Sequence, residues 1–202
     1  MNYLGAFVRA VIPAPAADIW ALVSDPTRHP QLAGSGQVVQ TEVITEPPFG
    51  LGSRFQSEQN VNGIKYATVS HVVVYEAERR IAWRIGLPGT PAFGQIWQFV
   101  LTPQEGGTLV ENGVVLPYVL PTIFPFSVAA QQVGQLEINA IRSTLHNIAT
   151  LLNVSPPVAY DVSTAPPASL TALLPPAALL GVPIFLGFGL AGLELLRRRK
   201  VS

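Results

Sequence analysis

Apolar residues follow regular periods over residues 1–152 and lose that regularity beyond residue 152. Two-residue alternation predicts β-strands, and we place them at 3–12, 37–45, 52–60, 64–75, 79–85, 95–101 and 108–116. The strands are joined by short turns, including Asn62-Gly63, the dipeptide most typical of a two-residue hairpin. Strands this close together favour an antiparallel meander over strand–helix–strand units.

Three- and four-residue spacing predicts helices at both ends of this region. Pro15 suits the first turn of a short helix over residues 15–23, and the segment SDPTRHPQLA favours a second short helical turn. A stripe over 126–152 predicts a long helix, with apolar or small residues at Gly134, Ile138, Ile141, Leu145, Ile148 and Leu152. At roughly 1.5 Å per residue this helix is about 40 Å long, enough to cross a sheet. The fold class is therefore α+β.

The remaining residues divide into two further segments. Residues 153–169 contain two Pro-Pro pairs among small residues, a composition typical of a solvated linker. Residues 170–202 are almost entirely apolar and end in the basic cluster RRRK. We therefore expect a folded domain over 1–152, a Pro-rich linker over 153–169 and a hydrophobic tail over 170–202.

Charge and composition restrict the partners of the domain. The chain has 12 basic and 12 acidic residues, but four of the basic ones form the terminal cluster, so residues 1–160 are mildly acidic. No basic stripe of the kind that neutralises phosphates is present, and we expect no nucleic-acid partner. The absence of cysteine excludes disulfides, thiolate metal sites and a cysteine nucleophile.

Three stretches carry a resemblance to a known family. They are VRAVIPAPAADIWALVSDPTRHPQL near the start, YEAERRIAWRI in the middle and WQFVLTPQEGGTLVENGV before a proline-rich loop. Together with the order of elements they resemble the polyketide cyclase/dehydrase and lipid-transport group of the START-like (SRPBCC) superfamily, over residues 3–152. The resemblance implies a helix-grip fold, with about six to seven curved antiparallel strands around the long C-terminal helix. It also implies an apolar cavity between sheet and helix that binds a hydrophobic small molecule.

The residues expected to bind that ligand come from the inner faces of the strands and of the helix. Trp83 shares a strand face with Ile81 and Ile85, and Trp97 shares one with Phe99. Gly134 is costly inside a helix, which suggests that backbone or ligand approaches it closely. Tyr118, in the loop before the helix, is the expected polar group at the cavity mouth. The predicted ligand-binding residues are Phe55, Trp83, Trp97, Phe99, Tyr118, Gly134, Ile138 and Ile141.

The sequence assigns no catalytic residue and leaves open whether the protein is an enzyme. His29, His71 and His146 show no metal-ligand spacing, so we expect no metal site and no cofactor. Tyr66, Glu111 and Asn112 are polar groups that could reach the cavity, whereas the strand phase points Arg84 outward. Plain core packing explains each apolar candidate about as well as ligand binding does.

The tail contains GFGLAG, which matches the glycine spacing of a dinucleotide-binding turn. That motif requires a second strand carrying an acidic residue, and only LELLRRRKVS follows in this sequence. A membrane segment explains more, because residues 177–196 span about 30 Å as a helix, the thickness of a bilayer core. The tail also resembles PEP-CTERM sorting signals, although Pro-Glu-Pro is missing. The alternatives are a segment lying in the membrane interface and an apolar tail packed on the domain.

Three functions fit these features. The favoured one is a membrane-associated carrier, with a single-pass C-terminal segment, that binds or transfers a hydrophobic molecule such as a lipid or a polyketide. The second is a polyketide cyclase or dehydratase that uses the same cavity, and the third is a non-catalytic anchored surface protein. The basic cluster favours export of the domain, but no export signal precedes the first strand, so we favour a cytoplasmic domain.

Overall fold

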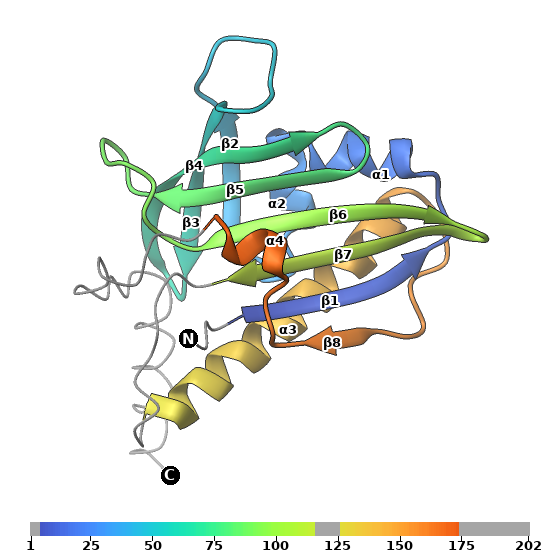
Figure 1. Ribbon diagram of the computed structural model, residues 1–202. Coiled ribbons are helices and arrows are strands. Elements are labelled where there is room, and N and C mark those ends of the chain that lie inside the picture. Colours follow the sequence, from blue (N-terminus) through green and yellow to red (C-terminus); the bar gives the residue numbers. More distant parts are fainter. Residues whose placement is uncertain (1–4, 116–125, 174–202) are drawn as a thin grey trace.

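The computed structural model describes residues 5–115 and 126–173, with residues 126–133 described by their backbone only. These residues form eight strands and four α-helices, which follow one another in the order expected for a helix-grip fold (Figure 1). The strands are β1 (Gly5–Ile12), β2 (Val38–Val43), β3 (Arg54–Val61), β4 (Ile64–Glu76), β5 (Arg80–Gly86), β6 (Ile96–Gln104), β7 (Gly107–Val115) and β8 (Asp161–Ser163). The helices are α1 (Ala16–Val23), α2 (His29–Leu32), α3 (Phe126–Leu151) and α4 (Ala168–Thr171), and a 3₁₀ turn over Pro26–Arg28 joins α1 to α2.

The strands form one curved antiparallel sheet in the order β2-β3-β4-β5-β6-β7-β1-β8. The predicted hairpin between β3 and β4 is confirmed, because Val61 pairs with Ile64 and both turn residues, Asn62 and Gly63, have positive φ. The predicted α+β class, meander and long helix are likewise confirmed. One face of the sheet receives α1, α2 and α3, and the opposite face receives α4 (Figure 1).

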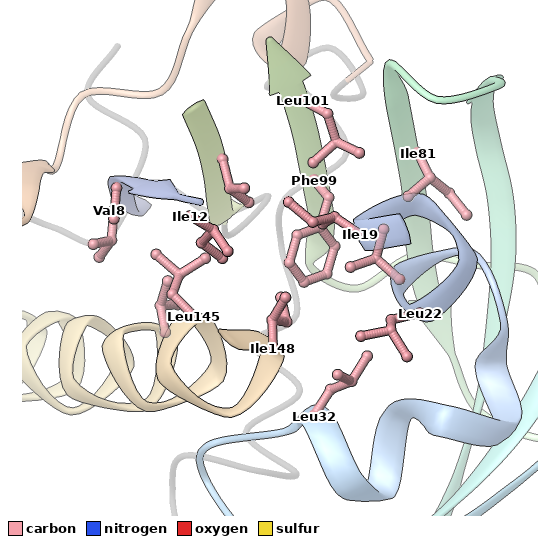
Figure 2. Close-up of a cluster of buried hydrophobic side chains, with 14 of the residues drawn as sticks. Val8, Ile12, Ile19, Leu22, Leu32, Ile81, Phe99, Leu101, Leu145 and Ile148 are labelled. Atoms are coloured by element: carbon pink, nitrogen blue, oxygen red, sulfur yellow. The ribbon is translucent and has the colours of Figure 1, made fainter. Parts of the chain in front are cut away.

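The core lies between the sheet and the C-terminal half of α3. Leu145 and Ile148 of α3 point toward side chains of the sheet and of α1, including Ile12 and Ile19 (Figure 2). All four are fully buried. Side chains therefore fill the space between the sheet and the C-terminal half of α3, and they fix this half of the helix to the sheet.

Residues 153–173 differ from the predicted solvated linker. The segment 161–163 forms β8, which pairs with β1 and extends the sheet by one strand. Leu170 of α4 is fully buried against Phe7, Ala82, Ile96 and Val115 on the outer face. The segment pairs with the otherwise free edge of β1 and covers this apolar patch on the outer face. The composition of the sequence alone does not predict these contacts.

The predicted tail begins within this ordered segment. Residues 170–173 belong to α4 and its C-terminal turn, where Arg84 of β5 donates a hydrogen bond to the carbonyl of Leu173. Arg84 thus points outward, as the strand phase predicted. Residues 174–202, with the proposed membrane segment, lie outside the described residues. In the described part, no helix has the length and apolar character needed to cross a membrane.

Candidate ligand-binding cavity

A cavity of about 250 Å³ lies between the sheet and the middle of α3, over residues 136–144. Strands β3 to β7, the α2–β2 connection, the β5–β6 loop and α3 all contribute to its wall. The side of α3 that faces it carries Leu136, Glu137, Ala140, Ile141 and Thr144. The sheet and α3 therefore lie further apart along residues 136–144 than at the solid core around Ile148.

Aromatic side chains form one wall of the cavity. The ring centroids of Phe55 and Trp83 are 5.8 Å apart at 65°, and those of Trp83 and Phe99 are 6.2 Å apart at 33°. Trp97, on the next inward position of β6 before Phe99, also lines the cavity. Rings locked against one another in this way present a rigid apolar surface with π faces available to a ligand.

Hydroxyl and amide groups of β3 and β4 form a second wall. Inward positions carry Ser57 and Gln59 on β3, and Tyr66, Thr68 and Ser70 on β4. Ser57 shares a 3.3 Å hydrogen bond with Thr41, and the amide of Gln59 donates to Thr68 at 3.5 Å. The cavity is therefore amphipathic, which suits a mainly apolar ligand that carries a few polar groups.

Gly34 fixes one side of the cavity where the α2–β2 connection touches α3. A Cβ atom at Gly34 would lie 2.2 Å from the carbonyl oxygen of Ala140, so only glycine fits this contact. The Gly34 amide donates to the hydroxyl of Thr144 at 3.0 Å, and that hydroxyl donates to the Ala140 carbonyl at 3.0 Å. This close approach holds the α2–β2 connection against α3.

The cavity is open to the surface, and its wall includes exposed apolar side chains on α3 and on the β5–β6 loop. Leu136 is 48% exposed and Phe93 is 38% exposed, and both line the cavity. Two large apolar side chains beside an opening provide a surface that an apolar ligand can cross without full hydration.

Glu137 places an acidic group in the wall near this opening. Its side chain is half-buried, and desolvation raises the pKa of Glu137 to about 7. Tyr66 lies across the cavity from it. The pKa of Tyr66 is raised first by burial and then by the charge of Glu137. Near neutral pH the carboxyl therefore exchanges between its protonated and ionised forms.

His29 lies deeper, between two aromatic rings of the apolar wall. Its ring centroid is 5.3 Å from that of Phe55 at 86° and 5.2 Å from that of Trp83 at 31°. Nε2 lies 3.1 Å from the carbonyl oxygen of Val23. Burial lowers the pKa of His29, an effect that its contact with the Val23 carbonyl partly offsets.

The predicted ligand-binding residues fall into three groups. Phe55, Trp83, Trp97, Phe99 and Ile141 line the cavity, and their binding of a ligand stays a prediction. Ile138 is buried in the core and does not line it, and Tyr118 lies outside the described residues.

The close approach that the sequence predicted at Gly134 is not found among the described residues. A Cβ atom there would meet no described atom within 4 Å, so the close approach inferred from the sequence is absent in this part of the chain. Gly134 does not line the cavity either. Gly134 lies on α3 as predicted, but no described residue of another element packs against it.

Other polar candidates also separate by strand face. Asn112 and Tyr66 line the cavity, whereas Glu111 lies on the outer face. There Glu111 accepts hydrogen bonds from Arg9 Nε at 2.6 Å and from the amide of Gln98 at 2.7 Å. Among the described residues no cluster of His, Asp and Glu could hold a metal ion.

From the sequence, His29 was considered only as a metal ligand, and Glu137 was not predicted as a site residue. Glu137 had an available signal, because it precedes Ile141 by four residues and therefore shares its helix face. His29 had none, because its aromatic neighbours come from β3 and β5, far away in the sequence. Only the folded sheet brings these rings together.

Comparison with known proteins agrees with this architecture. Residues 7–152 match the family described as polyketide cyclase / dehydrase and lipid transport. An uncharacterized protein of Mycobacterium tuberculosis strain H37Rv is 32% identical over 72 residues, which are 36% of this chain and 32% of the relative. A second M. tuberculosis protein, from strain CDC 1551, is 36% identical over 61 residues, or 30% of this chain and 27% of the relative. The chain thus spans about a third of the length of these curated relatives.

Solved structures share the fold at low sequence identity. The di-domain ARO/CYC StfQ of the steffimycin biosynthetic pathway has a TM-score of 0.57 at 12% identity, over 73% of this chain and 50% of StfQ. Protein NE0264 from Nitrosomonas europaea has a TM-score of 0.55 at 16% identity, covering 74% of this chain and 94% of that protein. The match to the family over most of the chain, with the helix-grip architecture, shows that the protein belongs to the polyketide cyclase/dehydrase and lipid-transport family.

Proposed function

We propose that the protein binds or transfers a hydrophobic small molecule in the cavity between the sheet and α3. The observation that carries this proposal is the unfilled volume of about 250 Å³ lined by Phe55, Trp83, Trp97 and Phe99. Side chains that line an unfilled volume lack packing contacts on one side. A bound apolar ligand would supply these contacts. The exposed Phe93 and Leu136 provide a path between cavity and surface.

Native mass spectrometry of the purified protein tests this proposal. We expect an adduct of one apolar small molecule per chain, which organic extraction removes and identifies. Naphthalene-type probes added to the extracted protein should bind at one site per chain. A protein that carries no adduct and takes up no probe would contradict the proposal.

The position of Leu173, which directly precedes residues 174–202, supports tethering of this cavity to a membrane by those residues. Arg84 binds the carbonyl of Leu173, and Gly86, two residues further along β5, lines the cavity. A tether that starts here would direct the β5–β6 side of the cavity toward the bilayer, where hydrophobic ligands partition. The proposed arrangement keeps the domain on the cytoplasmic side.

Cell fractionation tests the tether separately from ligand binding. The full chain is expected in the membrane fraction and a chain ending at residue 173 in the soluble fraction, with the domain protected from protease added outside intact cells. Equal distribution of the two chains would disprove tethering, and digestion of the domain in intact cells would place it on the outer side.

Glu137 supports a second candidate function, a cyclase or dehydratase that uses the same cavity. A carboxyl with a pKa of about 7 can both donate and accept a proton near neutral pH, as general acid–base catalysis requires. Tyr66 lies near enough for its pKa to respond to the Glu137 charge, so a polar ligand group at this point would meet two proton-transfer groups.

The raised pKa of Glu137 predicts a specific effect of Glu137→Gln on stability. The native carboxyl stays protonated up to about pH 7, whereas the unfolded one ionises near pH 4.5. Stability is therefore lost as pH rises between these values. Above pH 7, Glu137→Gln should be more stable than wild type by about 1–2 kcal/mol, a value reduced for partial exposure, while the two proteins should converge near pH 5.

Urea unfolding at pH 5, 6, 7 and 8 measures this difference. The matched control is Glu58→Gln, which removes a carboxyl at an exposed position on β3 outside the cavity. The contribution of His29 is common to all three proteins and cancels in the differences. A Glu137→Gln difference that does not change with pH would mean that the carboxyl titrates as it does in water.

A further inference from the structure

The protonation of His29 follows from one hydrogen bond. Nε2 lies 3.1 Å from the carbonyl oxygen of Val23, and a carbonyl can only accept, so Nε2 carries the proton. In the neutral ring, Nδ1 is then an acceptor with a free lone pair. The flanking rings of Phe55 and Trp83 hold the imidazole in this orientation.

The described residues provide no hydrogen-bond partner for the Nδ1 atom of His29. No hydrogen bond joins Nδ1 to any of the described residues, and Nδ1 is not among the fully buried polar atoms that lack a partner. His29 lines the cavity, so its ring belongs to the surface that a bound ligand contacts. A fixed acceptor thus lies within a mostly aromatic wall.

We infer that Nδ1 of His29 accepts a hydrogen bond from the ligand, and that the cavity therefore selects a neutral, ring-containing alcohol or phenol over the ether that lacks the hydroxyl hydrogen. The inference rests on the proposed function and adds the chemical class of the ligand. The apolar part of such a ligand would lie against Trp83 and Phe55, with its hydroxyl directed at Nδ1. His29 is a ligand-binding residue in this assignment.

The charges around the cavity exclude a carboxylate ligand at this position. Asp25, before the 3₁₀ turn, is the acidic group that acts on the His29 ring, and Glu137 and Tyr66 line the same cavity on α3 and β4. None of these side chains can carry a positive charge, so none can neutralise an anion. Nδ1 of the neutral ring cannot donate to a carboxylate oxygen, whereas it can accept from a hydroxyl.

A matched pair of fluorescent probes tests the inference with the full chain. 2-Naphthol and 2-methoxynaphthalene have the same rings, but only 2-naphthol donates a hydrogen bond. Wild type should bind 2-naphthol about 3- to 10-fold more tightly than the ether, the range expected for one net hydrogen bond. His29→Phe keeps an aromatic ring between Phe55 and Trp83 but has no acceptor atom, so it should bind both probes within about 2-fold of each other.

His146→Phe is the matched control, because His146 is exposed on α3 and does not line the cavity. It should retain the wild-type preference. Long-range ¹H–¹⁵N spectra of wild type give a reading that does not depend on the folding of a variant. The Nδ1 resonance of His29 should move when 2-naphthol is added and stay in place with 2-methoxynaphthalene.

The outcomes separate this inference from the proposed function. If both probes bind wild type equally and the Nδ1 resonance does not move, the cavity binds ligands but His29 does not select them. If neither probe binds wild type, the proposed function and the inference both fail. A preference that persists in His29→Phe would assign the acceptor to another cavity group, such as Ser57 or Thr68, and would also overturn the inference.

Discussion

Thr68→Phe is expected to weaken binding of a hydrophobic probe such as 2-methoxynaphthalene by about 100-fold. Thr68 is buried at the centre of β4, with its side chain on the cavity wall. A phenyl ring there would occupy space that the ligand needs, and a ligand that can no longer bury roughly 100 Å² of apolar surface loses about 2.5 kcal/mol of binding energy. Aromatic residues are well accommodated in strands, so the fold should persist.

Ala67→Phe is the matched control for this variant. Ala67 is the preceding residue of β4, so its side chain points to the other face of the sheet and does not line the cavity. Titration of probe fluorescence should show wild-type affinity for Ala67→Phe and almost none for Thr68→Phe. Equal affinity in all three proteins would place the probe outside the cavity.

The strands and the long helix could be predicted because each shows a periodic pattern of apolar residues within its own sequence. Alternation within 81–85 and 97–101 defined which side chains share a face, and those faces are the inner ones in the structure. The stripe through Ile141, Leu145 and Ile148 likewise identified the buried side of α3. Local pattern determined these elements because one face of each is buried.

β8 was not predicted because its stability is not local. Three residues, Asp161–Ser163, have no alternation that distinguishes them from a solvated linker. They form a strand because β1 otherwise leaves an open edge, and because Leu170 fills an apolar patch made by β1, β5, β6 and β7. The composition of residues 153–169 indicates neither the free edge of β1 nor the apolar patch on the outer face.

The cavity wall could be predicted only in part for a related reason. Strand phase brings Phe55, Trp83, Trp97 and Phe99 to one face, but phase does not state where α3 lies far enough from that face to leave volume. Ile138 and Ile141 belong to the same stripe, yet only Ile141 lines the cavity. Their difference depends on the path of the helix relative to the sheet, which is a tertiary property.

This division of the interior into solid and open halves predicts unequal costs for two truncations on the same helix. Ile148→Ala should destabilise the protein by about 4 kcal/mol, because Ile148 lies in the solid cluster with Ile12, Ile19 and Leu145 (Figure 2). Ile141→Ala should cost about 2 kcal/mol, since one side of Ile141 borders the cavity and already lacks packing partners. Both side chains are fully buried, so burial alone predicts equal costs.

Urea unfolding of the ligand-free protein measures both variants, and probe titration supplies an independent reading. Ile141→Ala should still bind the hydrophobic probe, because the truncation enlarges the cavity, and Ile148→Ala should leave the affinity unchanged wherever the protein is folded. If the two truncations cost the same in the ligand-free protein, the volume near Ile141 is closed by side chains in solution, and the structural basis for a carrier and for an enzyme is lost together.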